Sequence, residues 1–377
     1  MVKTIVPHFI WLFLLFIAYD YFNQVNNGGN GYKTGDWLIN YSEGPIRRGL
    51  IGTLFYYSAG LGMSLRWITY VVQVLFYVAV FFFVSQIYSL REREWEWTLF
   101  LFSPAFLLFP FYDLAGGFRK EIIVFASFGL LCFCYARRQV RNIQLLAVGA
   151  IFLLAAFSHE PTALTLPFFL YIFYQCYKHA LITKSVALVT SLSFCFISIF
   201  AVLFAYVFKG DSAIASAICK SVMEKGFESQ ICRGAIAWLA KDAAYNTGLV
   251  YNVLWGSLKL YVPLLLISIT PIFLVSWLRR ETVVLLLIGM LFRIPLLIVA
   301  TDWGRWIHIY VFFLFSIVLA ESVWKKLEFR KIPLFVVFLY LTTWSVPHDF
   351  CGSDCNGFNG FISKAYKLLN MVSARVY

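Results

Sequence analysis

The sequence predicts an all-α, polytopic integral membrane protein with about eleven transmembrane helices in a single domain, residues 1–377. Hydrophobic residues make up 61% of the chain and charged residues only 13%, against roughly 45–50% and 25% in soluble proteins. The mean hydropathy is +0.77. This composition excludes a soluble globular enzyme, a disordered chain and a disulfide-rich miniprotein.

The first apolar segment, 6–19, begins like a signal peptide, but no small-x-small cleavage site follows it. We therefore expect an uncleaved helix with a cytoplasmic N-terminus. Glycines interrupt the apolar segment 50–64, so a re-entrant or interfacial helix is expected there. The other apolar segments long enough to cross a bilayer are 67–88, 97–112, 121–136, 144–158, 162–178, 185–208, 255–278, 282–300, 306–323 and 332–347.

The loop charges favour this orientation. Short loops on the predicted cytoplasmic side carry basic pairs such as Arg137–Arg138 and Lys325–Lys326, as the positive-inside rule requires. Two longer loops, 24–66 and 209–250, then face the periplasm together with the C-terminus. The longer polar loop in the second half, 209–250, is expected to form a small helical cap.

The cysteines fall into two groups. Cys132, Cys134, Cys176 and Cys195 lie in predicted spans, where they are expected to be packing residues. The pairs Cys219 with Cys232 and Cys351 with Cys355 lie on the predicted outer side. Close pairs on one face indicate two disulfides in an oxidising compartment. Zinc is the rival interpretation, but paired histidine spacing is absent, and no metal is predicted.

Ionisable residues gather at the outer ends of four predicted spans. Such residues are costly at a membrane boundary and usually pair with one another or serve a site. Arginine is always charged and suits phosphate, whereas histidine and carboxylates can act as general bases. The residues are Asp36, Arg47 and Arg48 after the first span, Asp113, Arg119 and Lys120 after the third, His159 and Glu160 after the fifth, and Asp302 and Arg305 after the ninth.

Each cluster also has a structural interpretation. Arg47 and Arg48 could anchor to lipid headgroups, and Arg119–Glu121 could be a solvated helix start. His159 and Glu160 could mark a helix N-terminus, and Asp302 and Arg305 could form a local ion pair. Arg293, inside a predicted span, is expected to snorkel or to pair internally. The coincidence of the four clusters on one side favours a shared functional surface.

Motifs for other functions are missing. The chain has no P-loop, GxSxG, HExxH or DxD sequence, so ATP-driven pumping and zinc proteolysis have no support. It also has no basic soluble module for nucleic acid. No cofactor is expected.

The outer clusters Arg47–Arg48, Arg119–Lys120, His159–Glu160 and Asp302–Arg305, together with the 209–250 loop, resemble bacterial O-antigen or capsular polysaccharide polymerases (Wzy type) and related lipid-linked glycosyltransferases. The resemblance implies a multi-pass inner-membrane enzyme that joins undecaprenyl-diphosphate-linked repeat units at the periplasmic face. It implies a lipid-linked glycan donor and acceptor, with a chain-length regulator as a candidate partner.

The chemistry that the resemblance implies assigns roles to these residues. Arg47, Arg48, Arg119 and Arg305, assisted by Lys120, would hold the departing diphosphate. His159 is the first candidate base, oriented by Glu160 or Asp302, with Asp36 and Asp113 in reserve. The alternatives are a transporter or flippase of lipid-linked sugars, a membrane acyltransferase, and a structural membrane subunit.

The predicted orientation can be tested with reporter fusions. Fusions after Arg138 and after Asp302 should report opposite sides of the membrane, cytoplasmic and periplasmic respectively. A reporter active on only one side, such as alkaline phosphatase, distinguishes them. The same side for both fusions would contradict the topology.

Overall fold

A computed structural model describes residues 2–91, 95–350, 352, 357–363 and 366. Apart from an isolated bridge between Val275 and Phe329, their regular structure is helical. The α-helices are α1 (Val2–Asn26), α2 (Leu50–Gly60), α3 (Leu65–Ser89), α4 (Thr98–Leu101), α5 (Phe109–Tyr112), α6 (Glu121–Ala136), α7 (Asn142–Ser158), α8 (Leu166–Lys178), α9 (Lys184–Val207), α10 (Ser212–Glu224), α11 (Ala243–Phe273), α12 (Arg280–Leu291), α13 (Ile294–Val299), α14 (Trp303–Glu321) and α15 (Leu334–Thr342). Short 3-10 helices are η1 (Asp36–Leu38), η2 (Trp95–Trp97), η3 (Glu160–Thr165), η4 (Ser229–Arg233) and η5 (Ala237–Ala240).

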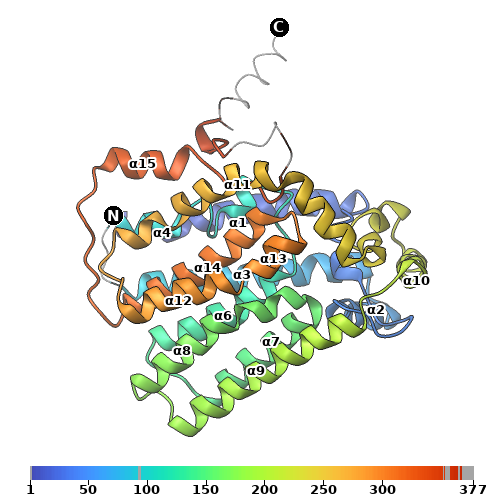
Figure 1. Cartoon of the computed structure of the whole chain (residues 1–377), viewed down its shortest axis with the longest axis horizontal. Coiled ribbons are helices and arrows are strands. Elements are labelled where there is room, and N and C mark those ends of the chain that lie inside the picture. Colours follow the sequence, from blue (N-terminus) through green and yellow to red (C-terminus); the bar gives the residue numbers. More distant parts are fainter. Residues whose placement is uncertain (1, 92–94, 351, 353–356, 364–365, 367–377) are drawn as a thin grey trace.

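The long helices form a bundle of roughly parallel and antiparallel axes (Figure 1). Helix α14 lies at its centre: every residue from Trp303 to Glu321 is buried, and α14 contacts α3, α6, α8, α11, α12 and α13. A helix that is apolar on all sides is expected in a core. Its position makes α14 the element against which the others are placed.

Five helical segments of the described chain are long and apolar enough to cross a membrane: α3, α9, α11, α14 and the 280–299 segment. The outermost of them, α9, leaves Leu192, Phe196 and Leu203 more than half exposed. A soluble protein rarely exposes such a continuous apolar surface to water. The fold is therefore all-helical, as predicted, and has the surface of a membrane protein.

Several predicted spans are shorter or interrupted, and prolines stand at the starts of the short helices found there. Segment 97–112 contains the last residue of η2 and the four-residue helices α4 and α5. Pro104 lies between these helices, where a continuous helix would lose a backbone hydrogen bond, and Pro110 lies in the first turn of α5. Pro295 follows the break between α12 and α13. In segment 332–347 only the nine residues of α15, after Pro333, are α-helical. The described residues therefore contain five segments long and apolar enough to cross a membrane as helices, fewer than the predicted eleven spans.

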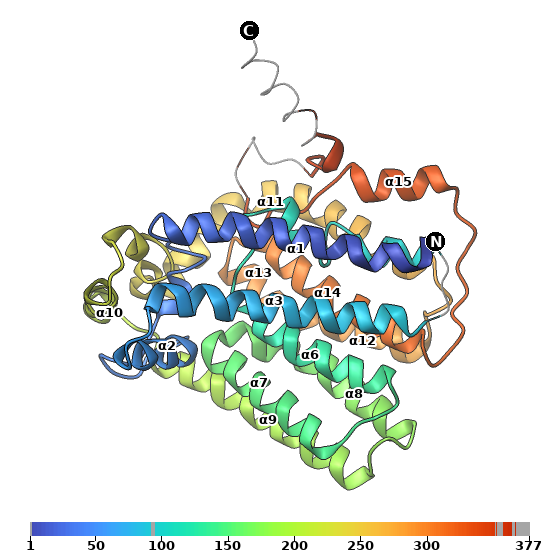
Figure 2. The ribbon, with the colours of Figure 1, turned by 180° about the vertical axis from the view of Figure 1, so that it is seen from behind.

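The predicted outer loops contain short helices. Helix α2 has 11 residues, which makes it roughly 16 Å long, about half of a bilayer's hydrocarbon thickness. The 209–250 segment contains α10, η4, η5 and the start of α11. Figure 2 shows α2 and α10 together at one end of the bundle, opposite the N-terminus.

The disulfide between Cys219 and Cys232 is present and joins α10 to η4, with its Cα atoms 5.6 Å apart. Cys132, Cys134 and Cys176 are buried free thiols, and Cys195 is a partly buried one. The predicted Cys351–Cys355 pair lies outside the described residues.

We expect the Cys219–Cys232 bridge to stabilise the cap formed by α10, η4 and η5 by about 2–3 kcal/mol, because it closes a short loop in the unfolded chain. Alkylation of denatured, unreduced protein should leave both thiols unlabelled while Cys132 and Cys176 react. Cys219→Ser with Cys232→Ser should lower the resistance of the cap to proteolysis. Labelling of Cys219 without reduction would show the bridge to be absent.

Candidate functional site

A cavity of about 260 Å³ lies where the helix ends meet at the α2 and α10 end of the bundle. Its walls come from η1, the loop before α2, the loop before α6, the end of α7, the start of α11 and the α13–α14 junction. Most of the sequence-predicted site residues line it, namely Asp36, Arg47, Arg48, Arg119, His159, Asp302 and Arg305. The tertiary structure thus brings the dispersed clusters together.

The first ion network joins α6 to α14. The Arg305 guanidinium donates two hydrogen bonds to Glu121, with Nε–Oε1 and Nη2–Oε2 distances of 3.0 and 2.9 Å. Both side chains are at most 6% exposed. Arg305 also pairs with Asp302 three residues earlier, as the structural interpretation expected. A bidentate arginine–carboxylate pair has a specific geometry, so it orients the Arg305 side chain at the cavity wall.

The second network joins the loop before α2 to η3. The Arg48 guanidinium binds Glu160 with distances of 2.7–3.0 Å, and Arg47 lies 3.8 Å from the same carboxylate. Lys120 lies behind the wall: its Nζ donates to the Arg48 carbonyl oxygen at 2.7 Å and lies 3.6 Å from Asp36. Burial alone would raise the pKa of the Asp36 carboxyl, but Lys120 and Arg48 outweigh it and hold that pKa below its usual value. Asp36 is therefore ionised at neutral pH.

Two residues beside the cations have left-handed backbone conformations. Arg48 has a φ of 68° and Phe118, directly before Arg119, has a φ of 55°. Such conformations cost about 1–3 kcal/mol in residues with side chains and cluster at functional sites. Here the Lys120 ammonium binds the Arg48 carbonyl, and the Tyr77 hydroxyl accepts the Phe118 N–H at 2.8 Å. Buried hydrogen bonds thus hold the strained turns that present the arginines.

Arg119 is the least compensated cation of the cavity. Its side chain is buried and lies over the Tyr32 ring, 5.2 Å from the centroid. Its Nη2 donates to the Ala115 carbonyl at 3.3 Å, and its buried Nε has no hydrogen-bond partner. No carboxylate of a described residue lies within 4 Å of it. Burial and the charge of Arg305 lower the pKa of Arg119, so a bound anion would stabilise its charged form.

His159 reaches the cavity from the end of α7 with both ring nitrogens lacking a hydrogen bond. Burial and the charge of Arg48 lower the pKa of His159 to about 4, so the imidazole is neutral at pH 7. Neither Glu160 nor Asp302, the two predicted orienting acids, makes a hydrogen bond to His159, because these carboxylates bind Arg48 and Arg305. The nearest acid is Glu121, 3.8 Å from Nε2.

Sequence reasoning missed three acid–base residues of this region: Glu121, His348 and Asp349. Glu121 was read only as part of a helix start, although it directly follows Arg119–Lys120. His348 and Asp349 line the cavity from the segment after α15. Asp113, which lies outside the cavity lining, binds His348 at 2.8 Å. An ionisable pair after the last apolar segment was the available signal.

The remaining predictions concern Arg293 and metal binding. Arg293 pairs internally, as one interpretation expected: its Nη1 donates to the Leu164 carbonyl oxygen at 2.8 Å. Among the described residues, no three His, Cys, Asp or Glu side chains are grouped as metal ligands would be.

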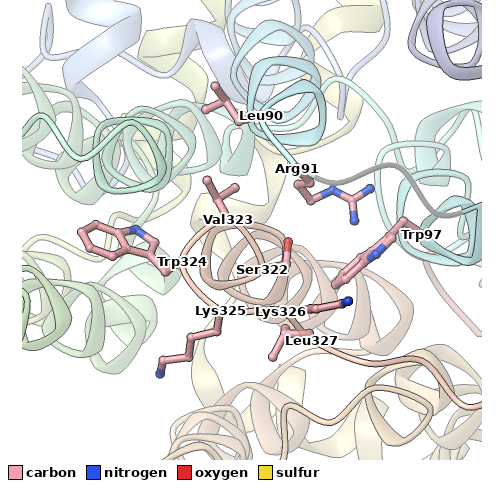
Figure 3. Close-up of a pocket in the computed structure, with 9 residues that line it drawn as sticks. All are labelled: Leu90, Arg91, Trp97, Ser322, Val323, Trp324, Lys325, Lys326 and Leu327. Carbon is pink, nitrogen blue, oxygen red and sulfur yellow. The ribbon is translucent and has the colours of Figure 1, made fainter.

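A second cavity, of about 150 Å³, lies at the opposite end of α14 (Figure 3). It is lined by Arg91, Trp97, Lys325 and Lys326 among others. These basic residues belong to the loops predicted to be cytoplasmic. The described residues of this lining include no carboxylate, histidine or cysteine.

Comparison with known proteins finds no matching family model, curated protein or solved structure.

Removing one partner of the Glu121–Arg305 pair should be strongly destabilising, because a buried charge loses its main partner. We expect Glu121→Ala to lower the free energy of unfolding by about 3–5 kcal/mol. Glu281→Ala is the matched control, because it breaks an exposed pair with Lys178 and should cost at most about 1 kcal/mol. Denaturant unfolding in detergent micelles measures both variants. Equal losses would mean that the buried pair does not organise the site.

Proposed function

We propose that this protein is a bacterial inner-membrane glycosyltransferase that joins undecaprenyl-diphosphate-linked oligosaccharide units at the periplasmic face. The observation that carries the proposal is Arg119, a buried arginine in a cavity wall with no carboxylate partner among the described residues. An uncompensated buried cation is costly. It is expected where a negatively charged ligand completes its pairing.

The leaving group of this reaction fits the cations. When the bond from the sugar to the lipid diphosphate breaks, negative charge develops on the phosphate oxygens. Arg119 and Arg47 are available to receive it, because Arg47 only shares the Glu160 carboxylate with Arg48. Arg48 and Arg305 are already bound to acids and hold the walls. A planar guanidinium can contact two phosphate oxygens at once.

The size and lining of the cavity fit a sugar–phosphate group. Its 260 Å³ is below the roughly 300–1,000 Å³ of pockets for drug-sized ligands. We therefore expect it to hold the reacting sugar and phosphates, with the rest of each glycan outside. Tyr32, Trp238 and Trp306 contribute aromatic faces to the lining, on which a sugar ring can stack. His159 is the sequence-predicted base for the acceptor hydroxyl.

The membrane placement is part of the proposal. The cavity is formed at one end of the bundle, and the basic residues around Arg91 and Lys325 lie at the other. With the basic end in the cytoplasm, the cavity faces the periplasm. Undecaprenyl-diphosphate-linked glycans, a chain-length regulator and membrane lipids are the partners that this placement allows.

We expect Arg119→Ala to lower turnover on the order of 10²-fold, the typical effect of losing one donor to a developing charge. Arg119→Lys should restore only part of it, because lysine lacks the bidentate fork. The assay is conversion of lipid-linked repeat units into longer chains by purified protein. Arg233→Lys, an exposed arginine of η4 outside the cavity lining, is the matched control.

The outcomes separate the competing functions. Near-normal chain lengthening by Arg119→Ala, at normal protein levels, would mean that this arginine is structural. A wild-type protein that moves lipid-linked sugars across a vesicle membrane without lengthening them would favour the flippase.

A further inference from the structure

An aspartate–histidine pair lies at the cavity next to the arginines. Asp113 comes from the loop after α5 and His348 from the segment after α15, 235 positions later. The His348 Nδ1 lies 2.8 Å from the Asp113 Oδ2, and the His348 backbone N–H donates to the same oxygen. The second oxygen, Oδ1, accepts the backbone N–H groups of Ala115 and Gly116 at 3.1 and 3.0 Å. Every contact on this carboxylate is thus a donor.

These contacts determine the tautomer of the imidazole. Burial alone would raise the pKa of the Asp113 carboxyl, but the hydrogen bonds that it accepts from the His348 side chain, the His348 backbone and the Gly116 backbone outweigh burial, and the pKa is lowered. An ionised Asp113 can only accept a hydrogen bond, so in the neutral ring Nδ1 carries the hydrogen and the lone pair is on Nε2. Nε2 makes no hydrogen bond to a described residue, and the ring lines the cavity with a quarter of its side chain exposed.

The backbone holds His348 in position. The Tyr261 hydroxyl donates to the Pro347 carbonyl oxygen at 3.2 Å. A Cβ atom on Gly304 would lie 1.7 Å from that oxygen, and one on Gly116 would lie 2.7 Å from the His348 Cβ. Only glycine permits so close an approach at these two positions. The segment is therefore seated against α14 and the loop before α6, where the cavity cations are.

We propose that His348, positioned by Asp113, is the base that takes the proton from the acceptor sugar hydroxyl. This inference rests on the proposed function and deepens it. Two features distinguish His348 from His159. A carboxylate sets the tautomer of His348, whereas His159 has no hydrogen bond on either nitrogen. A quarter of the His348 side chain is exposed, whereas His159 is only 3% exposed.

The acceptor hydroxyl oxygen bonds to the anomeric carbon of the donor sugar while its proton passes to His348 Nε2. The bond from the anomeric carbon to the phosphate oxygen breaks, and its electron pair leaves with the lipid diphosphate. The resulting imidazolium is stabilised by Asp113 and later releases its proton to water. Arg119, Arg305, Asp302 and Asp349 are the other charged groups that line this part of the cavity.

The first test requires no enzyme activity. Diethyl pyrocarbonate acylates a neutral imidazole nitrogen that has a free lone pair, and mass spectrometry locates the adduct. We expect His348 to react severalfold faster than His159 and His308, which are buried. Asp113→Asn should slow the reaction of His348. The control Asp242→Asn, at the N-cap of α11, should leave the rate unchanged, because asparagine caps helices as well as aspartate does.

The second test is kinetic. His348→Gln should lower turnover roughly 10²-fold or more, as expected for loss of a general base, while donor binding stays within about twofold. Asp113→Asn should lower turnover by a smaller factor with unchanged donor KM. His179→Gln is the control with normal turnover, because the His179 ring lies against Trp324, 4.3 Å between ring centroids, at the other end of the bundle.

Three results would contradict these proposals, and they are distinguishable. Lengthening of chains by His348→Gln at the wild-type rate would overturn the role of His348. Acylation of His159 in preference to His348 would do the same, whatever the activity. A reactive His348 in a wild-type protein that cannot transfer sugars would support the aspartate–histidine pair and contradict the proposed function.

Discussion

The buried ion pair between Glu121 and Arg305 is the contact on which the candidate site depends. Apolar packing has no preferred direction, so the wholly buried surface of α14 does not by itself set how far the helix extends toward the cavity. The two hydrogen bonds between Arg305 and the first residue of α6 do have a direction. We infer that this pair sets the register of α14 against α6. His159 and Asp302 take their places around it.

The cavity walls that carry Arg48 and Arg119 are held differently, by hydrogen bonds that support two strained turns of the backbone. The left-handed residues Arg48 and Phe118 turn the chain just where it presents Arg48 and Arg119. Lys120 is bound to the Arg48 carbonyl, and the Trp37 indole donates to the Phe118 carbonyl at 3.2 Å. Lys120, expected to assist in phosphate binding, therefore acts in this structure as a support for the turn that presents Arg48.

The arginines of the cavity differ in how fully carboxylates neutralise their charge, and this difference indicates different roles. Arg48 and Arg305 each bind a carboxylate through two guanidinium nitrogens, which is how a structural arginine is usually satisfied. Arg119 has only a carbonyl and a tyrosine ring, and Arg47 has a share of one acid. Arg119 and Arg47 therefore retain positive charge at the cavity wall. The same cavity is lined by two imidazoles, His159 and His348, and by the rings of Tyr32, Trp238 and Trp306. This combination has the composition expected of a site for an anionic, ring-containing ligand.

The sequence by itself determined the class of the protein and the ingredients of the site. Low charge and long apolar segments predict a helical membrane protein. Most ionisable residues lie at or beyond the ends of those segments, because they are costly inside them, and Arg293 is an exception. The Cys219–Cys232 bridge could also be predicted, because its partners are close in the chain. The interruptions around Pro104 and Pro295 could have been anticipated from the effect of proline on helices.

Only the tertiary structure decided which acid meets which base. Glu160 follows His159 in sequence, yet it binds Arg48, 112 positions away. Glu121 binds Arg305 across 184 positions, and Asp113 binds His348 across 235. Side chains that are adjacent in the chain point in different directions at a helix end. The packing of the helices determines which acid and base come into contact. Because that packing is non-local, no spacing rule could have revealed the aspartate–histidine pair or the unpaired Arg119.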